Sequence, residues 1–196
     1  MPQRNEQNIN NKNKIAMGII NLFDKDVTLN AVLYIIQQMG GKVDMHKIFK
    51  TLYFADQEHL SKYGRTITGD VYIAMHYGPV PSRTDDIFKA VRGDSYFPAG
   101  DLKDYFHFVN RYIVTNNKDA DLDYLSESDL ECLNHSISLC KDLNFEELTK
   151  KSHGLAWENT ARDRVMSYAD ILREEGDTEG YVEYITNKME LESSFC

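Results

Sequence analysis

The sequence predicts a mainly helical α+β protein, in which a helical domain contains a small three-stranded antiparallel sheet. Most apolar residues recur at the i, i+3, i+4, i+7 spacing that places them on one face of a helix. Runs rich in β-branched and aromatic residues interrupt this pattern only in the middle of the chain. The chain has 196 residues, which is about the size of one domain and enough to bury a sizeable core.

Composition divides the chain into two parts. Residues 1–26 begin with a polar, asparagine-rich stretch, and such stretches bury too little apolar surface to offset the entropy lost on ordering. We therefore expect a flexible N-terminal segment. Residues 27–192 carry the periodic apolar pattern and are expected to fold as a single domain.

Capping residues mark the ends of the two first helices. A helix that begins at an N-cap of Thr28 or Asn30 should end at the glycine pair 40–41. The next helix should span about residues 44–63 and end at Gly64, because its apolar residues keep the helical spacing up to that glycine.

Two capping boxes mark further helices. Ser82 with Asp85 predicts the start of a helix that ends at Gly93, and Ser126 with Asp129 predicts the start of another. Apolar spacing predicts three more helices, over about residues 145–151, 168–174 and 178–192.

Three short runs predict strands, over residues 71–77, 106–109 and 112–114. The last two are separated by two polar residues, which is typical of a hairpin. Three antiparallel strands are about the minimum for a stable sheet, so we expect all three runs to pair. Residues 78–81 hold one glycine and two prolines and are expected to form a turn.

Charge and cysteine content exclude several classes of protein. The chain carries 22 Lys+Arg and 31 Asp+Glu, a net charge of −9, which disfavours nucleic acid and anionic membranes as partners.

Cys132 and Cys140 are too far apart on one helix to bridge, so reduced thiols are expected. No apolar run approaches the roughly 20 residues of a membrane helix, and the N-terminus is unlike a secretion signal. We expect a cytoplasmic protein.

Asp56 is the most informative single residue, because it lies on the apolar face of its helix with Tyr53 and Leu60. A carboxylate on such a face needs hydrogen bonds or a cation. One interpretation is structural: Asp56 accepts hydrogen bonds from the backbone of residues 64–70 or from His76. The other is functional, with Asp56 as a general base or as an anion that binds a partner.

The HYGPVP stretch, residues 76–81, allows the same two interpretations. Proline fixes φ and removes N–H donors, while Gly78 reaches backbone conformations that other residues avoid. The stretch is either a rigid corner between a strand and a helix, or a corner that also presents His76 and Tyr77 to a ligand or partner.

Metal and cofactor motifs are absent from the sequence. The six histidines show no HxxxH, HExxH or HxH spacing, and there is no GxSxG, Walker A or GxGxxG motif. Residues 119–130 begin like a calcium loop, but Tyr124 replaces the turn glycine and Leu130 replaces the closing glutamate. We predict no cofactor, no metal site and no catalytic residue.

Five stretches, in this order, resemble the Panacea domain, a family of SocA-like antitoxins that also includes proteins described as phage-associated. They are LYFADQEHLSKYGRTITGD, AMHYGPVPS, LSESDL, SHGLAW and MSYADI, and the resemblance covers about residues 29–175. It implies a helical domain with a small sheet that neutralises, by direct binding, a toxin encoded beside it, with no enzymatic activity. The motif falls on Tyr53, Asp56, Gly64, Gly69, Asp70, Met75, Gly78, Pro79, Val80 and Pro81.

The sequence thus predicts the antitoxin of a bacterial or prophage toxin–antitoxin system whose partner is a cognate toxin protein. Two alternatives stay open. The resemblance to SocA also implies a proteolytic adaptor that delivers a toxin to a ClpXP-type protease, engaging it through the N-terminal segment or residues 193–196. A small hydrolase-like enzyme would use Asp56 with His76. The candidate partner-binding residues are Tyr53, Asp56, His76, Tyr77, Pro79, Val80 and Phe88.

Overall fold

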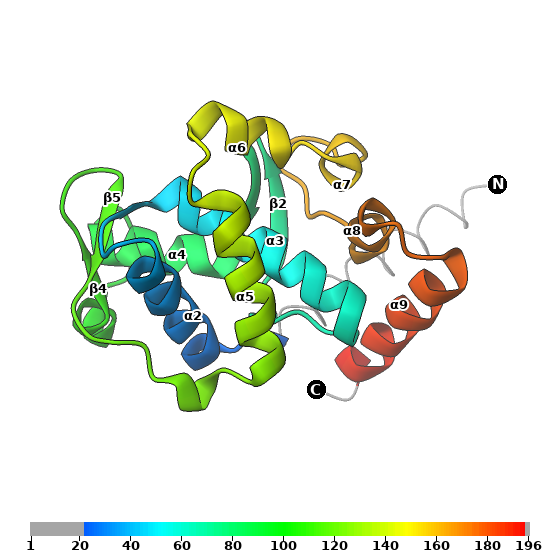
Figure 1. Cartoon of the computed structure of the whole chain (residues 1–196), viewed down its shortest axis with the longest axis horizontal. Coiled ribbons are helices and arrows are strands. Elements are labelled where there is room, and N and C mark those ends of the chain that lie inside the picture. Colours follow the sequence, from blue (N-terminus) through cyan, green and yellow to red (C-terminus); the bar gives the residue numbers. More distant parts are fainter. Residues whose placement is uncertain (1–21, 195–196) are drawn as a thin grey trace.

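The computed structural model describes residues 22–194, so most of the expected N-terminal segment and the last residues of the C-terminal tail lie outside it. The described chain is mainly helical with a small three-stranded antiparallel sheet, as predicted, and it has a second, two-stranded sheet that was not predicted (Figure 1). Its helices are α2 (Lys25–Gln38), α3 (Met45–Tyr63), α4 (Ser82–Arg92), α5 (Glu127–Cys140), α6 (Phe145–Lys151), α7 (Leu155–Glu158), α8 (Tyr168–Glu175) and α9 (Glu179–Ser194), with short 3₁₀ helices η2 (Gly100–Asp104) and η3 (Leu122–Tyr124).

Helix α3 lies at the centre of the fold, between two hydrophobic clusters (Figure 1). Ile48, Phe49 and Leu52 pack into the first cluster, which α3 shares with α2, α4 and α5. Tyr53 and Leu60 pack into the second, which includes the buried faces of α8 and α9. A single helix therefore joins both halves of the core. Its side chains also position the hairpin of residues 72–81, which is described below.

Helix α2 begins earlier than the sequence predicts. Its N-cap is Asp24, whose side chain accepts hydrogen bonds from the backbone N–H groups of Asp26 and Val27. Thr28 and Asn30 instead donate their side-chain hydrogen bonds back to carbonyl groups one turn earlier. The prediction was wrong because Asp, Thr and Asn are all suitable caps, and the sequence does not rank three candidates so close together.

Most other helix boundaries are confirmed. Asp44 caps α3, and Gly64 ends it in the left-handed conformation, with φ 69°. Ser126 and Asp129 form the predicted capping box of α5. Helices α6, α8 and α9 lie where the apolar spacing predicts them. Cys132 and Cys140 are buried and unpaired, as expected.

The predicted sheet has the wrong third strand. Strands β4 (Phe106–Phe108) and β5 (Ile113–Asn116) pair as expected, but the third strand is β1 (Val43–Asp44), with Val43 opposite Val114. Strand β2 (Tyr72–Met75) pairs instead with β3 (Gly78–Pro81) in a sheet of its own. The prediction failed because a strand of two residues leaves no periodic pattern, and because the proline-containing stretch was expected to be only a turn.

Strand β3 accommodates two prolines because of its register. Tyr72 lies opposite Pro81 and Ala74 lies opposite Pro79, and these are the pairs in which β3 donates no hydrogen bond to β2. The peptide bonds before both prolines are trans. Gly78 follows the turn and carries the positive φ, 92°, that closes the hairpin. The other edge of β2 pairs with residues 163–166, so β2 is held on both of its edges.

Candidate functional site

Asp56 fastens the loop that leads into the hairpin. Its side chain is 1% exposed. One carboxylate oxygen accepts hydrogen bonds from the backbone N–H groups of Ile67 (2.7 Å) and Thr68 (3.1 Å), and the other accepts them from the hydroxyl groups of Thr68 and Tyr72 (2.7 Å). Burial raises the pKa of Asp56, while these bonds act in the opposite direction. The structural interpretation is therefore confirmed for the loop, and His76 takes no part in it.

Asp70 holds the far end of the hairpin, a role that the sequence did not predict. Its carboxylate accepts hydrogen bonds from the backbone N–H groups of Arg83 (2.9 Å) and Thr84 (2.8 Å) and from the Thr84 hydroxyl group (2.8 Å). These N–H groups lie at the start of α4, so Asp70 caps this helix in place of Ser82. The predicted capping box at Ser82 is wrong, since the N-cap is Pro81, without a side-chain hydrogen bond.

Most of the candidate partner-binding residues face inward. Tyr53 and Phe88 are fully buried, one in each hydrophobic cluster. Pro79 is buried and Val80 is half-buried against the first cluster. Asp56 is likewise buried, so of these five residues only Val80 keeps part of its surface exposed.

His76 and Tyr77, by contrast, are exposed at the hairpin turn. Tyr77 is 54% exposed, and its ring packs edge-on against Phe145, with the ring centroids 5.2 Å apart. Phe145, the first residue of α6, is itself 46% exposed. His76 packs against Tyr77, with the ring centroids 4.5 Å apart. Two segments distant in the sequence therefore build one aromatic surface.

This surface also borders a pocket. The pocket has a volume of about 620 Å³ and lies between the hairpin turn and the α6–α7 region. His153 stacks on Trp157 with the ring centroids 3.6 Å apart, and Trp157 donates a hydrogen bond to the carbonyl oxygen of Met75. We call Met75, His76, Tyr77, Phe145 and His153 the hairpin-tip surface.

A buried lysine lies beneath the hairpin-tip surface. The side chain of Lys50, from α3, is fully buried, and its ammonium group donates a 2.7 Å hydrogen bond to the carbonyl oxygen of Pro79. Burial lowers the pKa of Lys50 to about 7. Burial and the charge of Lys50 lower the pKa of His46 to about 4. The sequence contained a signal for this residue, because Lys50 lies three positions before Tyr53 and so shares its buried helix face.

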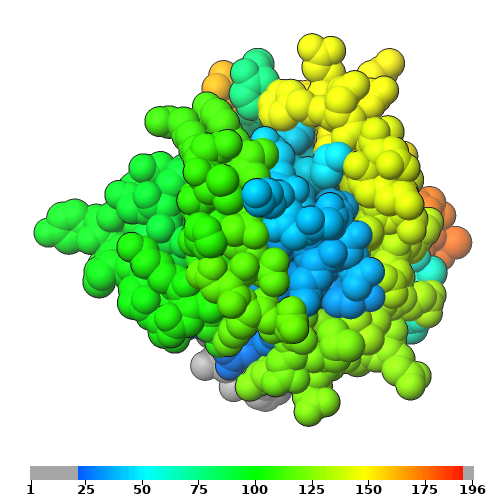
Figure 2. All heavy atoms as spheres, turned by 60° about the vertical axis from the view of Figure 1, so that its left-hand side comes forward, coloured from blue at the N-terminus to red at the C-terminus, as the bar shows by residue number. Residues whose placement is uncertain are grey.

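A second exposed aromatic pair lies on the loop between α4 and η2. Tyr96 is 98% exposed and Phe97 is 75% exposed. Figure 2 shows the segment after α4 protruding from the left of the molecule. The two rings pack edge to face, with centroids 6.0 Å apart. This exposed loop is therefore a rival partner-binding surface that sequence analysis did not identify.

Other kinds of site are not evident in the described residues. Within residues 22–194, no group of three His, Cys, Asp or Glu side chains is placed to hold a metal ion. No helix in the same part of the chain is long and apolar enough to cross a bilayer. The Asp56–His76 pair of the hydrolase alternative is not brought together, since Asp56 is enclosed and His76 lies in the exposed turn.

Fold and site together define a mainly helical domain that presents a braced aromatic hairpin. The model of the family described as antitoxin SocA-like, Panacea domain, matches residues 48–158, more than half of the chain. The protein belongs to this family. The match includes all but the first three residues of α3, both strands of the hairpin and helices α6 and α7. Comparison with curated proteins and with solved structures gives no match.

Proposed function

We propose that the protein is the antitoxin of a bacterial or prophage toxin–antitoxin pair, and that it neutralises its toxin in the cytoplasm by direct binding. Membership of the SocA-like antitoxin family supports an antitoxin role and a protein partner. The observation that carries the proposal is the hairpin-tip surface, where Tyr77 and Phe145 keep about half of their area exposed while packed against each other. Tyrosine and other large aromatic residues dominate the affinity of many protein interfaces.

The support under this surface favours tight binding. Asp56 fixes the loop before β2, Asp70 fixes the start of α4, and Lys50 holds β3 from below. A surface that is already ordered loses little conformational entropy when a partner docks. In the described residues, the hydrogen bonds of residues 94–97 are local ones, to Lys89, Arg92 and Ser95, so we place the main contact at the hairpin tip.

In this proposal the buried candidate residues act indirectly. Tyr53, Asp56, Pro79 and Phe88 position the hairpin, and catalysis has no part in neutralisation. Directed proteolysis would depend on the N-terminal segment or on residues 193–196, and most of these residues lie outside the described part of the chain.

Co-expression tests the proposal. The gene beside this one is induced alone, with the wild-type protein, or with the Tyr77→Ser/Phe145→Ser variant at matched protein level. We expect arrested growth alone, recovery with the wild type and no recovery with the variant. The half-life of the toxin should be the same in all three strains, because binding alone neutralises it. A neighbouring product that is harmless, or that stays toxic beside the wild-type protein, would overturn the proposal.

A further inference from the structure

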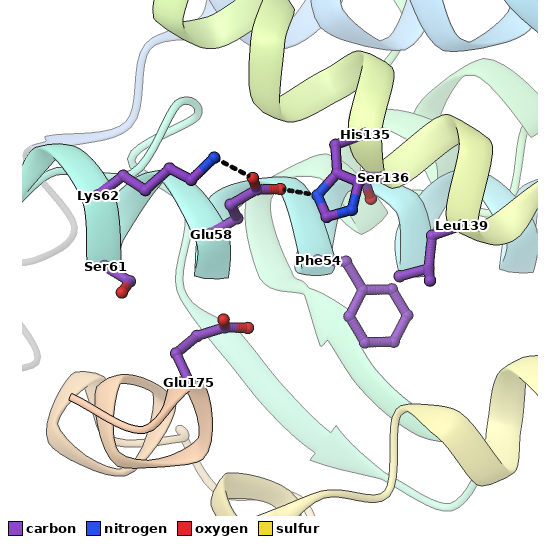
Figure 3. Close-up of a pocket in the computed structure, with 8 residues that line it drawn as sticks. All are labelled: Phe54, Glu58, Ser61, Lys62, His135, Ser136, Leu139 and Glu175. Atoms are coloured by element: carbon purple, nitrogen blue, oxygen red, sulfur yellow. Dashed lines mark hydrogen bonds and ion pairs between the residues drawn. The ribbon is translucent and has the colours of Figure 1, made fainter.

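A second pocket lies on another face of the molecule, between α3, α5 and α8. It has a volume of about 330 Å³. Figure 3 shows Glu58 of α3 on one side and Glu175 of α8 opposite, with its carboxylate directed into the pocket. Phe54 and Leu139 form an apolar wall at one end. The pocket thus combines carboxylates with an apolar wall, and we call it the α3–α8 groove.

The two carboxylates differ in their partners. Glu58 is paired with Lys62 (2.6 Å) and with His135 (2.6 Å), and Lys62 is shared with Glu131 (2.9 Å). Glu175 makes no hydrogen bond or ion pair with any residue in the described part of the chain. Lys62 and His135 also line the groove, but their ion pairs are with Glu58, so Glu175 has no direct counter-ion among the described residues.

The surroundings of Glu175 add further negative charge. Among the described residues, Glu174 accepts hydrogen bonds from neutral donors, on Gln57, Tyr53 and Ala156. One carboxylate oxygen of Asp177 is buried without a hydrogen-bond partner. All three acids lie at the C-terminal end of α8, where the helix dipole is also negative. Burial and the charges of Glu58, Glu174 and Asp177 raise the pKa of Glu175, while His135 lowers it. The acids around Glu175 outweigh this one positive group, and a further cation would relieve the excess of negative charge.

We propose that the α3–α8 groove binds an arginine side chain of the protein partner. A guanidinium group is planar, always charged and rich in N–H donors, so it can pair with Glu175 and with the free lone pairs of Glu58. The aliphatic part of an arginine side chain packs on apolar surface, which Phe54 and Leu139 supply. The net charge of −9 steers a basic partner toward the protein.

This inference depends on the proposed function in one respect: the proposed function is what makes the partner a toxin. The groove itself is tested without any partner, by NMR titration of the full chain with Nα-acetyl-arginine methylamide. We expect saturable shifts of the signals from Phe54, Ser61 and Leu139. The matched citrulline derivative has nearly the same shape without the charge and should give no saturable shift.

Two variants complete the test. Glu175→Gln should weaken binding of the arginine derivative about threefold or more, the size expected for an exposed ion pair. Asp104→Asn removes the same charge from η2, which packs on α4 and β4 away from α8, and should leave the affinity unchanged. Absence of saturable shifts, equal binding of the citrulline derivative, or an affinity insensitive to Glu175→Gln would each overturn the inference, whatever the co-expression test shows.

Discussion

The ammonium group of Lys50 and the carbonyl oxygen of Pro79 form a 2.7 Å hydrogen bond that ties the central helix to the hairpin. Lys50 is fully buried, and none of the causes that move its pKa is a neighbouring carboxylate. A buried cation without an anion is costly, so folding lowers the pKa of Lys50 and favours the neutral amine more than the unfolded chain does. The support of the hairpin is therefore coupled to protonation.

Lys50→Met should change how stability depends on pH. The pKa of Lys50 is about 7 in the folded protein and 10.5 in the unfolded chain. Between these values the unfolded state binds more protons, so the free energy of unfolding rises with pH, by at most about 1.4 kcal/mol per unit. The variant lacks this contribution. Urea denaturation across this range should show that the stability of the wild type rises relative to that of Lys50→Met.

The control for this experiment is Lys47→Met. Lys47 also lies on α3 and also donates to a backbone carbonyl, that of Lys141, but at the surface. It should keep the pH dependence of the wild type. A stability difference between wild type and Lys50→Met that stays constant from pH 7 to 10.5 would contradict the assigned protonation.

Gly78→Ala should destabilise the protein much more than Gly93→Ala. Both glycines have nearly the same positive φ, 92° and 90°, so each alanine adds left-handed strain of about 1–2 kcal/mol. A Cβ at Gly78 would also collide with the hydroxyl group of Ser152 and lie 3.0 Å from the Lys50 ammonium nitrogen, whereas at Gly93 it meets open space. Overpacking adds about 1–3 kcal/mol. Equal losses in thermal denaturation would show that Ser152 and Lys50 do not confine the turn.

Tyr72→Phe should lower the free energy of unfolding by about 1–3 kcal/mol, because the buried carboxyl group of Asp56 loses one of its donors. Tyr181→Phe removes a comparable hydroxyl group, which donates to the carbonyl oxygen of Ser61 at the molecular edge, and should cost about 0.5–1.5 kcal/mol. Chemical denaturation measures both. If Tyr72→Phe lowers the free energy of unfolding less than Tyr181→Phe does, Asp56 does not hold the loop before β2 in place.

Local signals explain what the sequence could predict of the fold. Asp44, Gly64 and the Ser126–Asp129 box act within one helical turn, so they are visible in the sequence itself. Asp70 accepts hydrogen bonds from N–H groups at the start of α4, although the whole hairpin separates the two in the sequence. No local sequence pattern therefore indicates this capping role. The two-residue strand β1 is equally invisible, since pairing with β5 alone defines it.

The site was predictable to a smaller extent. The sequence identified the hairpin turn and the buried acid, and the structure assigns them opposite roles: His76 and Tyr77 are exposed, while Asp56 is enclosed. An aromatic residue on an amphipathic helix suits a core and an interface equally well, so the sequence did not reveal that Phe88 is buried. Phe145 joins the surface only because α6 packs beside the turn, a contact that depends on the whole fold.

The most direct test of the account is the dissociation constant for the product of the adjacent gene, measured by calorimetry. Tyr77→Ser/Phe145→Ser should weaken binding about 30-fold or more, because aromatic anchors contribute about 2 kcal/mol or more to such interfaces. Tyr96→Ser/Phe97→Ser removes a more exposed aromatic pair and should change the constant less than about threefold. Binding that survives the first pair of substitutions and is lost with the second would contradict the central claim that the braced hairpin tip grips the partner.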